Sequence, residues 1–188
     1  MKFPLCFLPL ALLWLSACAP TTQYYVLSAA GSAPAGGLLT LGVGPVTLAP
    51  YLTERPNLVF KSSANRLEFS TEHEWAGELE DDFTRVLGIG LGRHVGTGRI
   101  RYYPWDRESE LDYQITVDVT RLHGTHDGEA VLEAAWRVYA LPESRLIASR
   151  NTTLREDLQV DGFEELAAAE SRLIDRLADV IARSLKFP

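Results

Sequence analysis

An alternation of apolar and polar residues from Leu111 to Thr120 is the clearest pattern in the chain. A period of two places the apolar side chains on one face, which predicts a half-buried strand over residues 111–122. Residues 131–140 and 145–155 read as two further strands. The turn residues 126–129 and 142–144 separate the three segments, so we expect an antiparallel meander.

Apolar residues three and four positions apart predict two long helices. The first is expected to begin near Thr71, since Thr71 and Glu74 have capping-box spacing, and to fade among the glycines at 88, 90 and 92. The second is expected to begin at Asp161, with Glu164 three residues on. Their apolar faces would be Trp75, Leu79, Phe83, Val86 and Leu87, and Phe163, Leu166, Ala167, Leu173, Ile174, Leu177, Ile181 and Leu185.

Shorter apolar segments at residues 38–48, 57–61, 66–70 and 99–103 predict additional strands. Residues 24–27 read either as a short strand or as an anchoring aromatic pair. The expected fold is therefore α/β, of the α+β type. It would have a single, mainly antiparallel or mixed sheet of five to seven strands, with two long helices packed on it.

The N-terminus has the form of an export signal. Lys2 precedes an apolar stretch over residues 3–15, and Leu15-Ser16-Ala17-Cys18 closes it. The stretch is shorter than the roughly 20 residues that span a bilayer as a helix, so we expect its removal. Cys18 would then carry a thioether-linked diacylglycerol and an N-acyl chain, which together anchor stably. The alternative is an ordinary secretory signal with an incidental cysteine.

The residue after Cys18 is Ala19. An aspartate there commonly retains a lipoprotein in the inner membrane, so Ala19 favours the outer membrane, with the domain facing the periplasm of a Gram-negative cell. The expected organisation is a signal peptide at 1–17, the lipidated cysteine and a flexible tether at 18–37, and one domain at 38–188.

Charge and cysteine content narrow the functional classes. The full chain has a net charge of −7, and removing residues 1–17 takes away Lys2 and no acidic residue, which gives −8. A net acidic domain argues against nucleic-acid binding and against broad adhesion to anionic headgroups. The only cysteines are Cys6 and Cys18, so the mature domain would have no disulfide and no cysteine metal site.

No pattern predicts catalysis, a cofactor or a metal. The glycines at 88–92 close a helix, whereas a dinucleotide loop follows a strand and opens one. His123 and His126 are expected at a solvated hairpin tip, and a metal site there would need ligands from elsewhere. The acidic residues within 78–82 would diverge along a solvated helix face. We therefore do not expect an enzyme.

The tryptophans divide into two kinds. Trp75 and Trp136 are expected in the core. Trp105 stands with Tyr102, Tyr103 and Pro104 at a strand end, where it is either an interface anchor or a plug of the core.

Several short motifs follow one another along the mature chain. They are the Cys18 motif with Tyr24-Tyr25-x-Leu27, then Gly44-Pro45-Val46 with Pro50-Tyr51-Leu52 and Arg55-Pro56, then Glu74-Trp75, and finally Pro104-Trp105 before the alternating strand. Together they resemble the PqiC-type lipoproteins, also called ABC-type transport auxiliary lipoprotein components. No single motif is specific, and the order carries the resemblance.

The resemblance implies an accessory protein at the outer membrane and no catalytic residues. Its partner would be a periplasmic MCE-domain assembly that moves lipids between membranes, and a homo-oligomer would suit such a ring or tube. We expect Tyr51, Leu52, Arg55, Pro56 and Trp105 to contribute to the partner or self-association surface. The alternatives are a structural or assembly lipoprotein of another envelope machine and a tethered envelope enzyme.

Overall fold

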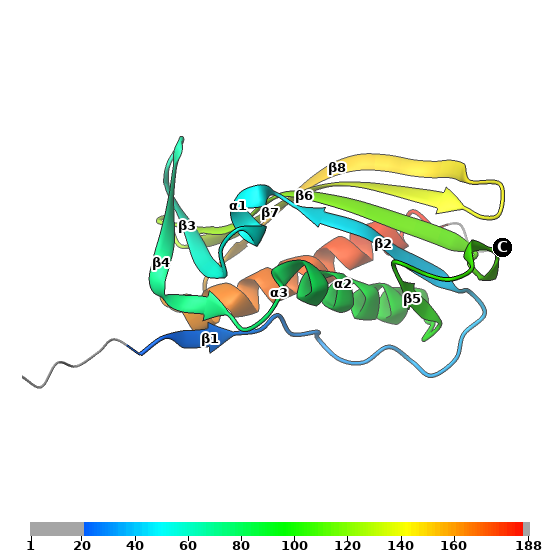
Figure 1. Cartoon of the computed structure of the whole chain (residues 1–188), viewed down its shortest axis with the longest axis horizontal. Coiled ribbons are helices and arrows are strands. Elements are labelled where there is room, and N and C mark those ends of the chain that lie inside the picture. Colours follow the sequence, from blue (N-terminus) through cyan, green and yellow to red (C-terminus); the bar gives the residue numbers. More distant parts are fainter. Residues whose placement is uncertain (1–20, 186–188) are drawn as a thin grey trace, which may run out of the picture.

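The alternating segment forms β6 (Tyr113–Thr125), the centre of a mixed sheet in the computed structural model, which describes residues 21–185. β7 (Glu129–Ala140) pairs antiparallel with β6, and β8 (Arg145–Asp157) pairs antiparallel with β7. The predicted meander is therefore confirmed (Figure 1).

The opposite edge of β6 is shared by two strands. β2 (Leu41–Leu48) runs parallel to its first half, and β5 (Ile100–Tyr102) adds in parallel to β2. β3 (Asn57–Ser63) pairs with only the last two residues of β6, Gly124 and Thr125. The sheet therefore forks along β6, and its two branches lie at opposite ends of that strand.

The second branch continues from β3 into β4 and β1. β4 (Arg66–Trp75) pairs antiparallel with β3, and β1 (Gln23–Tyr25) pairs in parallel with the end of β4. The sheet thus has eight strands, and the expected five to seven is wrong, although the fold is still α+β. The additional strand comes from residues 24–27, which the sequence allowed to be either a short strand or an anchoring aromatic pair.

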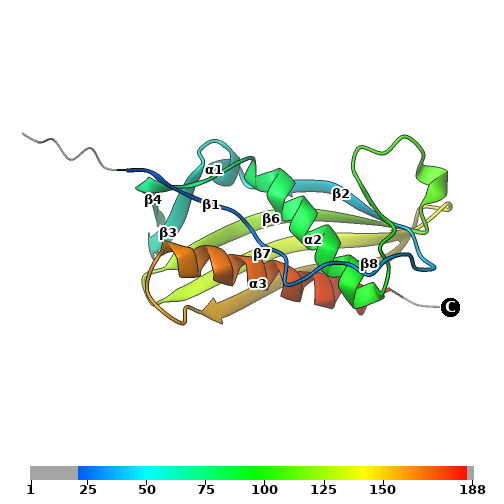
Figure 2. The same ribbon diagram turned by 90° about the horizontal axis from the view of Figure 1, so that it is seen from below.

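Two long helices cover one face of the sheet. α2 (Leu79–Val95) and α3 (Phe163–Ala182) cross next to each other on it, as Figure 2 shows, and α1 (Pro50–Thr53) is a single turn after β2. A short 3-10 turn occupies Glu108–Glu110. No helix within residues 21–185 combines the length and the apolar character needed to cross a membrane.

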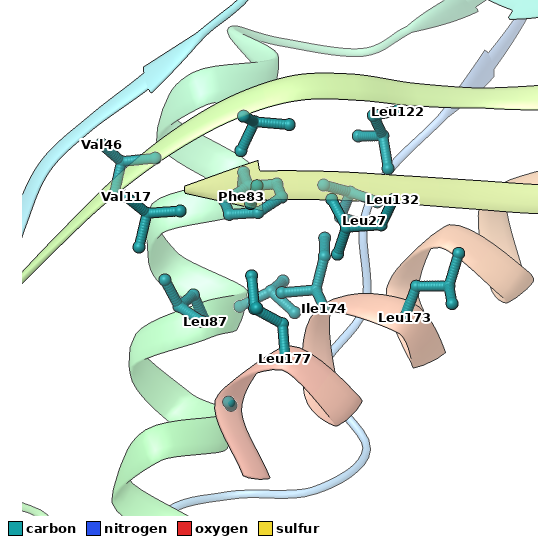
Figure 3. Close-up of a cluster of buried hydrophobic side chains, with 14 of the residues drawn as sticks. Leu27, Val46, Phe83, Leu87, Val117, Leu122, Leu132, Leu173, Ile174 and Leu177 are labelled. Carbon is teal, nitrogen blue, oxygen red and sulfur yellow. The ribbon is translucent and has the colours of Figure 1, made fainter. Parts of the chain in front are cut away.

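The core lies between the helices and the inner face of the sheet (Figure 3). Trp75 and Trp136 are buried, as predicted. Burial of one large apolar side chain contributes about 1.5–3 kcal/mol. The central members are Leu27, Phe83, Leu87, Val117, Leu122, Leu132, Leu173, Ile174 and Leu177.

The first long helix begins later than the sequence predicts. Residues 71–75 belong to β4, where Glu74 pairs with Asn57 and Trp75 pairs with Tyr25. Residues 73–75 are held by strand pairing, and the N–H groups of Glu72 and His73 donate to Oγ of Ser70, so the Thr71–Glu74 spacing forms no helix cap. The helix starts at Leu79 instead.

The glycines at 88, 90 and 92 lie inside α2 and do not end it. Gly96 ends the helix in the left-handed conformation, with φ 80°. A Cβ added at Gly90 would lie 2.8 Å from Cβ of Ala178 on α3. Gly90 therefore permits the close approach of the two helices.

The second long helix begins at Phe163 after Gly162, with no side-chain cap hydrogen bond. The predicted Asp161–Glu164 capping box does not form. Glu165 instead accepts a hydrogen bond from the backbone N–H of Gln159, at 3.3 Å.

Gly90→Ala tests the helix contact against Gly88→Ala. An added Cβ at Gly90 meets a Cβ fixed to the α3 backbone, whereas at Gly88 it meets the far end of the Tyr102 ring, which can move. We expect Gly90→Ala to lower the free energy of unfolding by about 1–2 kcal/mol. Gly88→Ala should leave it within about 1 kcal/mol, because helix propensity offsets the crowding. Urea denaturation measures both, and equal effects would contradict the contact.

Glu170 is an acidic side chain on the buried face of α3. It is 2% exposed, and burial raises its pKa to about 8 from the ordinary 4.5. The carboxyl group is therefore neutral at pH 7 in the folded protein, whereas the unfolded chain ionises it.

This difference predicts a stability that falls as the pH rises from 4.5 to 8. The folded state keeps a proton that the unfolded state releases, so each pH unit within this window costs up to about 1.4 kcal/mol. Glu170→Gln mimics the protonated form and should remove most of this slope, as measured by urea denaturation at pH 5 and pH 8. An unchanged slope would show that Glu170 does not cause it.

Candidate functional site

The segment nearest the predicted anchor is held against the domain. Cys18 lies outside the described residues, and β1 begins at Gln23, five positions later. β1 pairs along the end of β4, and the N–H of Ala76 donates to the carbonyl of Tyr25 at 2.8 Å. Residues 23–25, which fall within the expected tether over residues 18–37, therefore form part of the sheet.

An aromatic clamp fixes β1, formed by Tyr25, His73 and Phe163. The Tyr25 hydroxyl and His73 Nδ1 share a hydrogen bond of 2.8 Å. The His73 ring stacks on Phe163 at the start of α3, with ring centroids 3.8 Å apart. The clamp thus joins β1, β4 and α3, which lie far apart in the sequence.

The chain after β1 is also held by the helices. Leu27 is buried in the core, and Arg85 of α2 donates to its carbonyl at 2.9 Å. The N–H of Ser28 donates to Oγ of Ser171 on α3, at 3.0 Å. A groove of about 610 Å³ lies between residues 23–30 and α3.

The sequence-predicted interface residues in and after α1 have different environments. Leu52 is buried in the core, and the Tyr51 hydroxyl accepts the N–H of Leu122 at 3.3 Å. Arg55 is exposed, with its guanidinium 5.4 Å from the centroid of the Phe69 ring. Pro56 is exposed, and its carbonyl accepts the N–H of Trp75. Of this group, Arg55 and Pro56 are the residues that are exposed to solvent.

Trp105 belongs to a second surface, the aromatic cluster of Tyr102, Tyr103, Pro104 and Trp105. The Trp105 ring meets Tyr103 edge to face, with centroids 5.3 Å apart, and lies over Gly42 of β2. Tyr103 is 55% exposed. Tyr102, Pro104 and Trp105 line a groove of about 590 Å³. Trp105 therefore packs on the sheet and also presents one side to an open groove.

The two sets of predicted interface residues do not form one site. Gly42 lies near the start of β2, and α1 begins two residues after its end. A strand rises by about 3.3 Å per residue, so the two sets are separated by roughly 25 Å along β2. They remain separate candidate surfaces.

The two histidines considered for a metal site lie in different environments within the described residues. Within 21–185, no group of three or more His, Cys, Asp or Glu is placed to hold a metal ion. His126 is exposed at the β6–β7 turn, but His123 is buried, so the expectation of a solvated site is wrong for His123. Its ring faces inside the protein, where burial lowers its pKa below the ordinary value.

The acidic residues of the 78–82 segment serve the fold. Glu80 accepts the N–H of Leu48 at 3.3 Å, and Asp82 pairs with Arg85 at 2.9 Å. The carboxylates therefore have separate partners and do not converge on a common point.

The clamp predicts the effect of two substitutions. Tyr25→Phe removes a hydrogen bond worth about 1 kcal/mol, which should loosen β1. Hydrogen exchange at the amide of Ala76, which donates to Tyr25, should accelerate roughly fivefold. Tyr24→Phe is the control, because its side chain is exposed and should leave that exchange rate unchanged. Equal rates in both variants would contradict the clamp.

Solved structures of other proteins share this fold. A solved structure of an uncharacterized protein is 22% identical, with a TM-score of 0.73 over 88% of this chain and 99% of that one. Protein XCC0632 from Xanthomonas campestris is 16% identical, with a TM-score of 0.63 over 85% and 92%. At these identities the likeness concerns the fold alone. No curated protein matches the chain.

The sequence model of the ABC-type transport auxiliary lipoprotein component matches residues 25–182. This range runs from β1 to the last residue of α3, and so includes the clamp, both branches of the sheet and both long helices. The chain therefore belongs to the family of ABC-type transport auxiliary lipoprotein components, the PqiC-like lipoproteins.

Proposed function

We propose that this protein is an accessory lipoprotein of an MCE-type intermembrane lipid transport system. Acyl chains on Cys18 hold it at the outer membrane, and its domain docks the periplasmic MCE assembly there. Membership of the transport auxiliary lipoprotein family supports the general role. The MCE partner and the outer membrane are our inference from the motifs and from Ala19.

The observation that carries the proposal is the separation of two surfaces along the molecule. β1, next to the anchor, belongs to the branch at the C-terminal end of β6, and the aromatic cluster follows β5 at the other end (Figure 1). β6 has 13 residues and is roughly 40 Å long. A domain fixed to a membrane at one end presents the other end to the periplasm.

The aromatic cluster has the composition of a docking anchor. Tyr and Trp are enriched among the residues that dominate binding energy in protein interfaces. Tyr103 is exposed, and Trp105 is positioned by Gly42 and Tyr103. We therefore assign the partner surface first to this cluster and second to Arg55 and Pro56. A homo-oligomer would let several clusters meet a symmetric partner.

Affinity purification from gently solubilised envelopes tests the function. The bait is the full chain tagged after Pro188, which leaves the processing at Cys18 untouched. We expect a periplasmic MCE-domain protein to be recovered in stoichiometric amounts. Recovery of a different envelope machine would contradict the proposal and favour an assembly lipoprotein. Processing of an envelope substrate would favour the tethered enzyme.

Substitutions in the same assay test the surface. Trp105→Ala should weaken binding by about 2 kcal/mol, roughly thirtyfold in Kd. Tyr103→Glu should also weaken it, and its exposed side chain makes unfolding an improbable cause. Val160→Ala, an exposed position just before α3 at the other end, is the matched control. Loss of the partner only in the control would contradict this orientation.

A further inference from the structure

We propose that Tyr24 of β1 and Val26, the first residue after it, form an outward face that rests on the lipid surface that carries the anchor. The contact would hold the domain in one orientation instead of leaving it free on its acyl chains. This inference rests on the lipidation of Cys18 proposed above, and it goes beyond that proposal by adding a second contact with the membrane.

The length of chain before β1 limits where the domain can be. Four residues, 19–22, separate Cys18 from Gln23. Even a fully extended chain rises by at most about 3.6 Å per residue, so Gln23 lies within roughly 18 Å of the lipidated cysteine. Gln23 is itself fixed in the sheet opposite His73. The folded domain therefore begins next to the membrane.

Two apolar side chains are exposed at this point. Tyr24 is 65% exposed and Val26 is 54% exposed. In an extended segment alternate residues share a face, so these two point outward while Tyr25 turns toward His73. Isolated exposed apolar residues are common on protein surfaces. This pair is distinguished by its closeness to the anchor.

The chemistry of the pair suits a lipid interface. Tyrosine has an apolar ring and a polar hydroxyl, and it is enriched where hydrocarbon meets water. The chain has a net charge of −7, so attraction to anionic headgroups is not the source of the contact. Burial of the exposed apolar surface against lipid supplies the free energy.

The clamp makes such a contact effective. β1 is held by pairing with β4, by the Tyr25–His73 hydrogen bond and by the stack of His73 on Phe163. Force or torque on Tyr24 and Val26 therefore reaches the sheet and α3 directly. A membrane contact at β1 would direct the aromatic cluster at the far end toward the periplasm.

Spin labelling of the mature, lipidated protein in phosphatidylcholine vesicles tests the contact. Cys6 leaves with the signal and Cys18 is acylated, so a cysteine introduced elsewhere is the one free thiol. Nitroxides at Tyr24→Cys and Val26→Cys should collide more with oxygen, relative to a water-soluble nickel complex, than nitroxides at the control positions.

The controls are Leu38→Cys and Leu146→Cys, which are also exposed apolar positions, at 94% and 52%. Leu38 lies beside Gly36 and Leu39, whose carbonyls accept hydrogen bonds from Gly98 and Thr97 after α2, far from β1. An equal oxygen-to-nickel ratio at all four positions would overturn the contact.

Two further measurements distinguish a missing acyl anchor from a contact that depends on anionic lipid. The intact mass of the mature protein reports the acyl chains, and their absence would overturn both the anchor and the contact. Vesicles with added phosphatidylglycerol should give the same ratio at Val26→Cys. A raised ratio that appears only with the anionic lipid would overturn the apolar contact.

Discussion

The packing of α2 and α3 against one face of the sheet is the interaction on which the rest of the structure depends, with α2 lying mainly on β2 and α3 mainly on β7. Val117 and Leu122 of β6 and Leu132 of β7 face Phe83 and Ile174 of the helices (Figure 3). The second edge of β6 pairs with β2 near its start and with β3 at its end. Because both branches pair with this one strand, they lie at its opposite ends.

In the proposed role, this arrangement would separate membrane attachment from partner binding. The branch with β1 lies next to the predicted anchor, and the branch with β5 leads into Tyr103 and Trp105. Neither end needs catalytic groups for such a role, and two acidic side chains of α2 serve the fold, Glu80 by accepting the N–H of Leu48 and Asp82 by pairing with Arg85. The protein is a member of a transport auxiliary family, and its geometry suits a spacer with two differently specialised ends.

The sequence predicted the segments whose pattern depends on one buried face. The alternation in β6 and the apolar stripe of α3 both arise because one face of each element is buried in the core. Local periodicity was therefore sufficient to predict them. β1 could not be assigned, because three residues are too few for a period and its pairing depends on residues of β4 that lie 50 positions away. Residues 71–75 were misassigned for the same reason, since pairing with β1 and β3 overrides a local capping pattern.

The candidate sites were predictable to a smaller extent. The sequence singled out Trp105 from its aromatic neighbours, and the structure places it at an open groove. It also selected Leu52, which is buried, because apolar residues beside prolines look alike whether they face the core or solvent. The clamp was missed, since Tyr25, His73 and Phe163 meet only in the folded chain.

Site-specific photocrosslinking in intact cells tests the central claim most directly. A photoreactive residue is placed at Tyr103 or at Tyr24 in the full-length lipoprotein, and the crosslinked partners are identified by mass spectrometry. The account predicts that position 103 captures a periplasmic MCE-domain protein and that position 24 does not. Capture of that protein from position 24, or of an unrelated envelope machine from position 103, would contradict it.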